Sequence, residues 1–285
     1  MNIYSLSYAK YFLERALVFI FRRFQVPICD RQDRVFVSTN DKISAQIMVK
    51  GLYEREFLFC VCSLADKLEF RSKVALDVGA NIGNHSLFMS RYFDSVIAFE
   101  PCSYLNMVLR ANVLRNKINN VEVSSYGLGD SKGVAGVVEQ ASDNIGMVEL
   151  KRFGGGISND TERVQVEKGD ELLFDRYEKI GFIKIDAEGM EVSVIQGLQK
   201  CILRDRPLIA FESRRAKEGG DVISVLQKLG YFNYYEVSAS RIGLRDIFES
   251  GLVAIFRKKY VLQRLGELQD SHYPSIFATC DELDV

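Results

Sequence analysis

The 285-residue sequence predicts a doubly wound α/β fold, in which a mostly parallel sheet carries helices on both faces. Short apolar runs typical of strands alternate with apolar patterns at helical spacing. The central run, Val74–Val78, leads into glycines at Gly79 and Gly83 and then into a helical pattern from Ser86. Acids also stand at the ends of four predicted strands, so that carboxylates gather at one edge of the sheet: Asp77, Glu100, Asp186 and Glu212.

The elements of the predicted sheet follow one another in chain order. Strands are predicted over 74–78, 96–99, 121–126, 182–186 and 208–212, and helices over 86–89, 105–113 and 222–229. Runs at 231–237 and 252–257 predict a final strand pair that closes the sheet with one antiparallel strand. Between 131 and 168, short β-like runs at 134–139, 147–152 and 163–166 form an insert, which we expect to edge the substrate side of the pocket.

The segments flanking this sheet divide the chain into three expected parts. Residues 1–50 form an N-terminal extension, with a helix and then a hairpin of strands over 34–38 and 43–49. A helix over 53–68 opens the main domain at 51–260. Residues 261–285 are expected to form a charged and only partly ordered tail.

The N-terminal helix, Tyr11–Phe24, is apolar at helical spacing but too short in its apolar run to cross a bilayer. Its longest unbroken run is the six residues Ala16–Phe21, against about 20 for a membrane span. Charged residues on either side also exclude a cleaved signal. Two alternatives stay open: the helix contacts a membrane face or a partner subunit, or it packs on its own domain.

Composition excludes several classes of function. With 37 Lys and Arg against 38 Asp and Glu, the net charge is -1, so no general field attracts nucleic acid. The six cysteines form no C-x-x-C pair and lie mostly in apolar runs, which is typical of reduced, buried cysteines. We therefore expect a cytoplasmic protein, with membrane association only through the N-terminal helix.

The glycine bend after the central strand predicts the ligand. In a dinucleotide fingerprint the middle glycine approaches a pyrophosphate, and here Asn81 takes that place. Glu100, at the end of the next strand, can accept both hydroxyls of a ribose. A ribose without a pyrophosphate indicates S-adenosylmethionine. Asn81 disfavours the alternative of a nicotinamide-dependent oxidoreductase, and the retained Glu100 and Asp186 disfavour a catalytically idle binding or scaffold protein.

Three motifs give the chain a family resemblance. Leu76–Gly83, Phe99–Pro101 and Lys184–Glu191 resemble, in order and spacing, those of the FkbM family of S-adenosylmethionine-dependent methyltransferases. The resemblance extends over about 51–256 and implies a Rossmann-like class I methyltransferase fold. It also implies O-methylation of a hydroxyl on a sugar, glycan or polyketide-like metabolite. Tyr53-Glu54 and Asn144-Ile145-Gly146 are similar to further family patterns.

The predicted cofactor site draws residues from several strand ends. They are Glu54, Asp77, Gly79, Ala80, Asn81, Gly83, Glu100, Pro101, Gly127, Asp130 and Asp186. Asp130 could accept from an adenine amino group, or it could belong to an ordinary turn. Glu54 could equally be an acid favoured by the first turn of a helix.

The predicted chemistry depends on one acid and one histidine. Asp186 is expected to orient or deprotonate the acceptor hydroxyl, and His85 is the second candidate for the base. Because like charges repel, the converging carboxylates need a positive partner, which the sulfonium and ammonium of the cofactor could supply. A divalent metal on Asp186, Glu188 and Glu191 is the alternative, and no metal is predicted.

Overall fold

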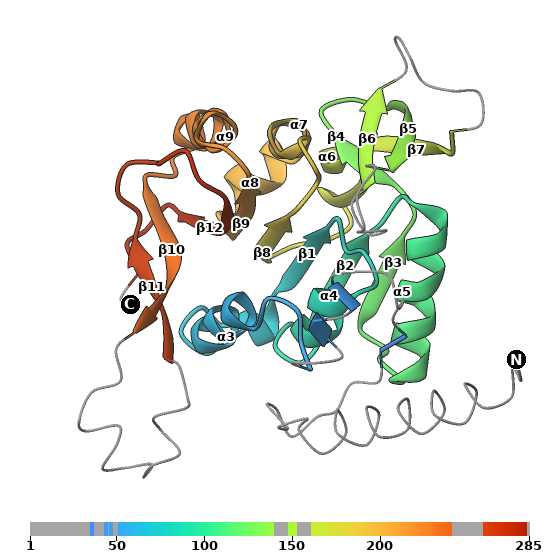
Figure 1. The fold of residues 1–285 in the computed structure, drawn as a ribbon, viewed down its shortest axis with the longest axis horizontal. Coiled ribbons are helices and arrows are strands. Elements are labelled where there is room, and N and C mark those ends of the chain that lie inside the picture. The colour runs from blue at the N-terminus through green and yellow to red at the C-terminus, as the bar shows by residue number, and fades with distance from the viewer. Residues whose placement is uncertain are drawn as a thin grey trace, which may run out of the picture.

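The structure is a computed structural model that describes residues 35–36, 43–44, 46–47, 51–139, 148–152, 161–240 and 259–283. Its main element is an eight-stranded sheet in the order β11-β10-β12-β9-β8-β1-β2-β3. Helices cover both faces of this sheet, as Figure 1 shows. The predicted doubly wound α/β architecture is therefore confirmed.

The elements have the following bounds in the described part of the chain. The main sheet consists of β1 (Val74–Val78), β2 (Ser95–Phe99), β3 (Val121–Ser124), β8 (Ile180–Ile185), β9 (Leu208–Ser213), β10 (Asn233–Ser240), β11 (Lys259–Arg264) and β12 (Tyr273–Thr279). One face carries α3 (Arg55–Leu64), the 3-10 turn Phe70–Ser72, α4 (Asn84–Met89) and α5 (Ser103–Arg115). The other face carries α6 (Gly169–Leu173), α7 (Glu191–Gly197), α8 (Gln199–Asp205) and α9 (Ala216–Lys228).

The central strand β1 is buried along its whole length. Because side chains alternate across a strand, Leu76 and Val78 join the core beneath α7, α8 and α9, whereas Ala75 joins the core beneath α3 and α4. Phe182 of β8 lies on the same side as Ala75. Both faces of the sheet are thus sealed, and ligands can reach it only at its ends.

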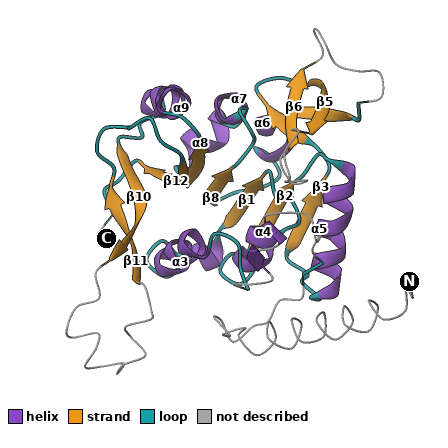
Figure 2. Ribbon diagram, in the orientation of Figure 1, coloured by secondary structure: helices purple, strands orange, loops and turns teal. Residues whose placement is uncertain are grey.

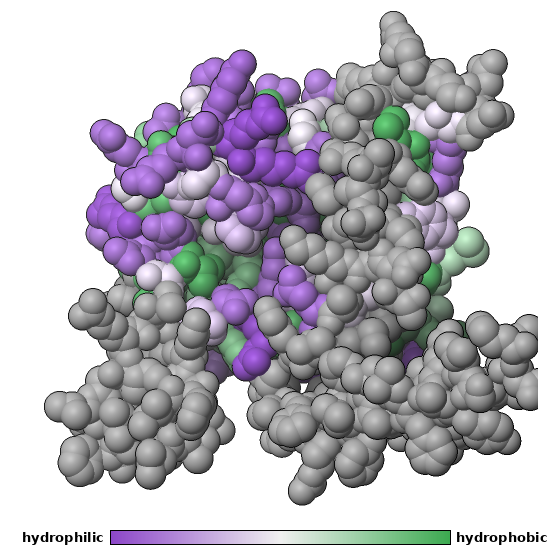
Figure 3. Space-filling model, in the orientation of Figure 1, coloured by the Kyte–Doolittle hydropathy of each residue, from purple (hydrophilic) through white to green (hydrophobic). Residues whose placement is uncertain are grey.

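The helices likewise bury one side against the sheet and expose the other side to solvent. In α9 the residues Gly219, Val222 and Leu226 are buried at helical spacing, and the opposite side of the helix is exposed. Figure 3 shows hydrophilic side chains over α7 and α9 on the face drawn there.

The predicted insert forms a second sheet of its own. Its order is β4-β7-β5-β6, with β4 at Gly127–Gly129, β5 at Gly133–Glu139, β6 at Val148–Arg152 and β7 at Arg163–Lys168. Figure 2 shows these strands as a separate group beyond the carboxyl end of β3. The three predicted β runs of the insert are confirmed, and β4 joins them because it pairs with β7 in parallel.

The C-terminal region departs from prediction. Residues after 260 were expected to form a tail, but β12 lies inside the main sheet, where it pairs antiparallel with both β9 and β10. Phe277 of β12 is completely buried. Since β11 also pairs antiparallel with β10, two strands run against the others instead of the one expected. The strand predicted at 252–257 lies outside the described residues.

The N-terminal extension can be assessed at a few positions only. Ile43, Ser44, Gln46 and Ile47 are helical, so the strand predicted over 43–49 is wrong at these residues. Ile43 and Ile47 are one helical turn apart and join the same apolar cluster, which explains the conformation. The helix predicted over Tyr11–Phe24 lies outside the described residues. Among the helices that are described, none is both long and apolar enough to cross a membrane.

Candidate active site

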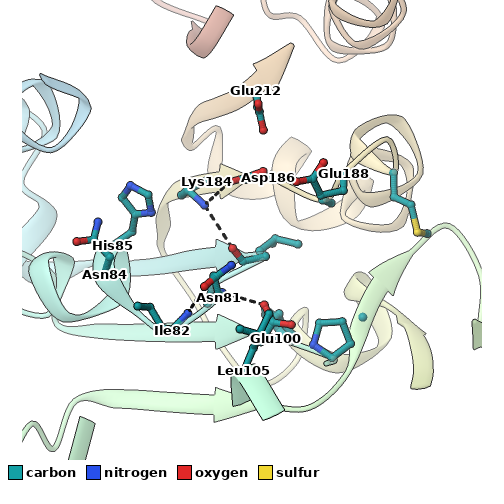
Figure 4. A pocket seen from close by; sticks show the side chains of 18 of the residues that line it. Asn81, Ile82, Asn84, His85, Glu100, Leu105, Lys184, Asp186, Glu188 and Glu212 are labelled. Atoms are coloured by element: carbon teal, nitrogen blue, oxygen red, sulfur yellow. Dashed lines mark hydrogen bonds and ion pairs between the residues drawn. The ribbon is translucent and has the colours of Figure 1, made fainter. Parts of the chain in front are cut away.

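A cavity of about 380 Å³ opens at the carboxyl ends of β1, β2, β8 and β9. Figure 4 shows how acids and one lysine from these strand ends face one another across it. Its lining includes Tyr53, Glu54, Gly79, Ala80, Asn81, His85, Glu100, Pro101, Gly127, Lys184, Asp186, Glu188, Glu212, Arg214 and His272. Carboxyl ends of parallel strands are where doubly wound folds bind ligands.

The bend after β1 has an unusual backbone. Gly79, Asn81 and Gly83 have φ angles of 76°, 51° and 92°, the left-handed region that glycine and asparagine adopt most readily. The amide N–H groups of Gly79 and Ala80 both donate to the Phe99 carbonyl at 3.0 Å. Asn81 therefore suits this bend for a conformational reason, since its side chain also accepts the Ile82 N–H at 2.7 Å.

Glu100 closes the bend from β2. Its Oε2 accepts the Asn81 N–H at 2.8 Å and its Oε1 accepts the Cys102 N–H at 3.0 Å. Burial raises the pKa of Glu100 to about 7, although these two hydrogen bonds act to lower it. Each oxygen keeps a lone pair that can accept from a ligand hydroxyl.

Lys184 neutralises the acids at the centre of the site. Its Nζ lies 3.4 Å from Asp77 Oδ1 and 3.4 Å from Asp186 Oδ2, and it is 3.5 Å from the Gly79 carbonyl oxygen. Asp77 also accepts from Ser86 Oγ at 2.5 Å. Burial alone would lower the pKa of Lys184, but Asp186 and Asp77 raise it above its ordinary value.

A second group of charges lies on the β9 side of the cavity. His272 Nε2 is 2.7 Å from Glu212 Oε1, and Arg214 pairs with Glu188. Burial and the neighbouring Asp186 raise the pKa of Glu212 to about 10. Burial also acts to raise the pKa of Asp186, but the Lys184 ammonium and the hydrogen bond from Glu212 outweigh it and the pKa is lowered. One proton is thus held between two carboxyls.

The loop before α3 is fixed to the bend by two pairs of contacts. Asn84 accepts the Tyr53 N–H at 3.2 Å and donates to the Tyr53 carbonyl at 3.0 Å. His85 Nε2 lies 3.1 Å from Glu54 Oε2, and the His85 ring meets Phe57 edge-on at 5.3 Å between centroids. These contacts place Tyr53 and Glu54 at the mouth of the cavity.

Most of the predicted site residues come together in this cavity. Glu54, Gly79, Ala80, Asn81, His85, Glu100, Pro101, Gly127 and Asp186 all line it. Asp77 does not, because it is fully buried behind Lys184. Gly83 does not either, since it packs against Leu109 and Leu87. Asp130 lies outside the lining, where its N–H donates to Ser193 Oγ at 3.0 Å.

The acids of the 184–191 motif, which the sequence analysis considered as metal ligands, have other partners in the structure. Glu191 accepts the N–H groups of Ala187 and Gly189 at 3.2 and 3.1 Å, so it holds the turn that leads into α7. Asp186, Glu188 and Glu212 place one oxygen each within 4.8 Å of one another. Lys184, Arg214 and His272 already pair with these three carboxylates.

Sequence reasoning missed the cations of the site. It treated the acids as awaiting positive charge from a ligand, whereas Lys184 and Arg214 supply it, and His272 adds a further partner for Glu212. One signal was available for Lys184: it is the direct register partner of Asp77 when β1 and β8 pair in parallel. No local pattern marks His272, because it reaches the site from the loop between β11 and β12.

Comparison with known families decides the class of protein. Residues 77–232, more than half of the chain, match the model of the methyltransferase FkbM domain. The chain belongs to the FkbM methyltransferase family. The fold is accordingly the Rossmann-like fold of class I methyltransferases, and S-adenosylmethionine is the cofactor.

The individual proteins that this chain resembles are distant from it in sequence. Methyltransferase sdnD from Sordaria araneosa is 25% identical over 201 residues, 59% of this chain and 74% of that protein. AMB antimetabolite synthetase AmbE from Pseudomonas aeruginosa is 28% identical over 185 residues, 51% of this chain but 8% of AmbE. The crystal structure of methyltransferase FkbM from Methylobacillus flagellatus KT aligns at a TM-score of 0.42 and 15% identity, over 73% of this chain and 44% of that one. The chain thus spans less than half of two of these proteins.

The cavity of this FkbM protein fits its cofactor. A volume of about 380 Å³ is within the usual range for a small-molecule site. Glu100 offers lone pairs to the ribose hydroxyls at one end. Glu54, Asp186 and Glu212 offer carboxyl oxygens toward the cationic part at the other.

Gly79→Ala should lower the free energy of unfolding more than the same substitution at a glycine with free space for a Cβ atom. A Cβ at Gly79 would lie 1.8 Å from the Asp186 carbonyl oxygen, so the end of β8 must move. We expect the free energy of unfolding to fall by about 2–4 kcal/mol, from the φ cost and the clash together. Gly189→Ala is the matched control, because Gly189 has φ 95° but no atom within 4 Å of an added Cβ. Urea unfolding giving equal losses for the two variants would contradict the close approach.

Proposed function

We propose that this protein transfers the methyl group of S-adenosylmethionine to a hydroxyl of a sugar, glycan or polyketide-like metabolite. The observation that carries the proposal is the position of Asp186. Its carboxylate lies in the same cavity as Glu100, half-exposed, with Lys184 holding it in the charged form. A charged carboxylate accepts the hydrogen bond of an attacking hydroxyl and can take its proton.

A larger groove adjoins the cavity and provides room for the acceptor. Its volume is about 1040 Å³, and among the described residues Tyr53, Glu54 and His272 line both spaces. Aromatic and acidic side chains line the rest, including Phe57, Glu56, Glu236, Tyr260 and Tyr273. Aromatic faces and carboxylates suit a neutral, polyhydroxylated acceptor, since they offer apolar contact and hydrogen-bond acceptors.

The residues of the chain position and polarise the reactants. The cofactor supplies an electrophilic methyl group on a sulfonium. Glu100 holds the ribose and thereby fixes the depth of the cofactor in the cavity. Asp186 accepts the hydrogen bond of the acceptor hydroxyl and directs its oxygen for in-line approach. Lys184 and Asp77 hold Asp186 in place from below.

Glu100→Gln should weaken cofactor binding without unfolding the protein. Removing the charge of a hydrogen-bonded carboxylate costs about 1.5–3 kcal/mol, so Kd should rise about 10-fold or more. Calorimetric titration with S-adenosylmethionine measures this. Glu162→Gln is the control, because Glu162 accepts the Ser103 N–H at 2.9 Å outside the cavity and its variant should bind normally. Unchanged Kd in Glu100→Gln would remove Glu100 from the site.

An acceptor screen tests the function itself. The protein is incubated with S-adenosylmethionine and a panel of glycosides, oligosaccharides and hydroxylated polyketides, and released S-adenosylhomocysteine is measured with the mass of each acceptor. We expect one class of hydroxyl compound to gain a methyl group. Methylation confined to amines or carbon acids would contradict the choice of oxygen. Binding of NAD in place of S-adenosylmethionine would contradict the proposal as a whole.

A further inference from the structure

The chain contains two histidines, and both line the cavity. Each is paired with a glutamate, but their surroundings are opposite. The side chain of His85 is 6% exposed and is packed between the rings of Tyr53 and Phe57. The side chain of His272 is 55% exposed and meets Glu212 at 2.7 Å. Only His272, of these two, can exchange protons with solvent directly.

His272 also lies where the two spaces meet. It lines both the cavity and the adjoining groove, together with Tyr53 and Glu54. A methyl group presented from the cavity and a hydroxyl presented from the groove must come together at this junction. The proton that the hydroxyl loses therefore originates within a few side chains of His272.

Glu212 connects His272 to Asp186. Its Oε1 faces His272 at 2.7 Å, and Glu212 and Asp186 place one carboxyl oxygen each within 4.8 Å of one another at the cavity wall. Figure 4 shows Glu212 on its strand beside Asp186. The three side chains form an unbroken row from the floor of the cavity to the surface.

We propose that Asp186, Glu212 and His272 form a proton path that carries the proton of the acceptor hydroxyl out to solvent. The proposal rests on the proposed O-methylation. It assigns a role to Glu212 and His272, which were not among the site residues predicted from the sequence. Asp186 touches the hydroxyl and is the catalytic residue, whereas Glu212 and His272 act through it.

Transfer of the methyl group to the acceptor oxygen releases one proton from the hydroxyl. The acceptor oxygen forms its bond to the methyl carbon as the bond from carbon to sulfur breaks, and the electron pair of that bond stays on sulfur. The hydroxyl proton passes to Asp186. Asp186 hands a proton to Glu212, Glu212 hands its own to His272, and the imidazolium releases one to water. The three groups return to their starting protonation.

The charges around the path explain why a path is needed. Lys184 and the Glu212 hydrogen bond keep the pKa of Asp186 low, so Asp186 is a weak final acceptor and must pass the proton on. Burial and Asp186 raise the pKa of Glu212 to about 10, so Glu212 already carries a proton and can receive one from Asp186 only as it passes its own to His272. The other charged groups facing the path are Arg214, which pairs with Glu188 and also lies 3.9 Å from Glu212 Oε1, and Glu54, which pairs with His85.

The test uses histidine NMR on the whole chain and needs no acceptor. Protein labelled at histidine Cε1 gives two signals, and His85→Gln identifies the signal of His272. Asp186→Asn removes the negative charge that, next to burial, raises the pKa of Glu212, and we expect Glu212 then to ionise directly beside His272. We expect the pH midpoint of the His272 signal to rise by about 1 unit, as for an opposite charge within 4–6 Å. Simple loss of a distant negative charge predicts the opposite direction.

The controls separate this proposal from the function on which it rests. The double variant Asp186→Asn with Glu212→Gln should abolish the rise. A fall, or no change, in Asp186→Asn alone overturns the path whether or not methyl transfer is found. With the acceptor from the screen, His272→Ala should lose about 10-fold or more in kcat and regain activity in imidazole buffer. The buried His85→Ala should gain nothing from imidazole, and equal rescue of both variants also counts against the path.

Discussion

Lys184→Met should lower the free energy of unfolding by about 3–5 kcal/mol, the usual cost of breaking a buried ion pair by removing one partner. Lys184 is 6% exposed, and it lies 3.4 Å from both Asp77 and Asp186. Methionine keeps the length of the side chain, so the loss is mainly electrostatic. Asp77 would remain fully buried, with Ser86 as its side-chain donor among the described residues. Urea unfolding at neutral pH measures the difference.

The pH dependence of this loss has a defined sign. Asp186 has a lowered pKa, so its contribution is present above the ordinary range of an aspartate and is lost as pH falls through the folded pKa. Lys184 has a raised pKa, so its contribution is present up to the ordinary range of a lysine and is lost only as pH rises through the folded value. The gap between wild type and variant should therefore be full at pH 7 and narrow in acid.

An exposed pair provides the control for Lys184. Lys132 Nζ lies 2.8 Å from Glu167, but the Lys132 side chain is 69% exposed. Lys132→Met should change stability little, because water and salt screen surface pairs. If both lysine variants unfold alike, the ion pairs of Lys184 are not what stabilises this end of the sheet.

Asp186→Asn should reduce turnover about 10²-fold or more while Kd for S-adenosylmethionine changes little. Asparagine keeps the shape and one acceptor oxygen but cannot take a proton. Initial rates with the acceptor from the screen, together with calorimetry, give both quantities. Asp175→Asn, at an exposed aspartate, should retain full activity.

Other outcomes for Asp186 are informative in different ways. If affinity falls together with turnover, Asp186 contacts the cationic end of the cofactor instead of the hydroxyl. If a chelator abolishes wild-type activity and magnesium restores it, the three neighbouring carboxylates hold a metal. We expect no effect of chelator, since cationic side chains already pair with these acids. Full activity in Asp186→Asn would exclude all of these roles.

The parallel half of the sheet could be predicted from sequence because its signals are local. Val74–Val78 is apolar apart from Asp77, as a strand buried on both faces requires, and Gly79 marks its end. The same logic placed Glu100 and Asp186 at one edge, and both line one cavity. Parallel register then brings strand ends together whatever the intervening sequence.

The antiparallel edge could not be predicted because its pairing is distant in sequence. β12 contains Pro274 and Ser275, which weaken its strand pattern, and it becomes a strand only by pairing with β9 and β10. The prediction of a strand over 43–49 was wrong for a related reason. Its alternation suits a strand, but Ile43 and Ile47 pack on an apolar cluster that exists only in the folded protein.

The position of β12 has a consequence for synthesis of the chain. β9 and β10 emerge from the ribosome well before Tyr273–Thr279, yet in the finished sheet β12 separates them. Until β12 is made, the nascent protein has two open strand edges next to an apolar core, which invites pairing with other chains. A premature stop or frameshift between residues 273 and 279 would thus produce an aggregation-prone product, even though the described residues that line the cavity had already been translated.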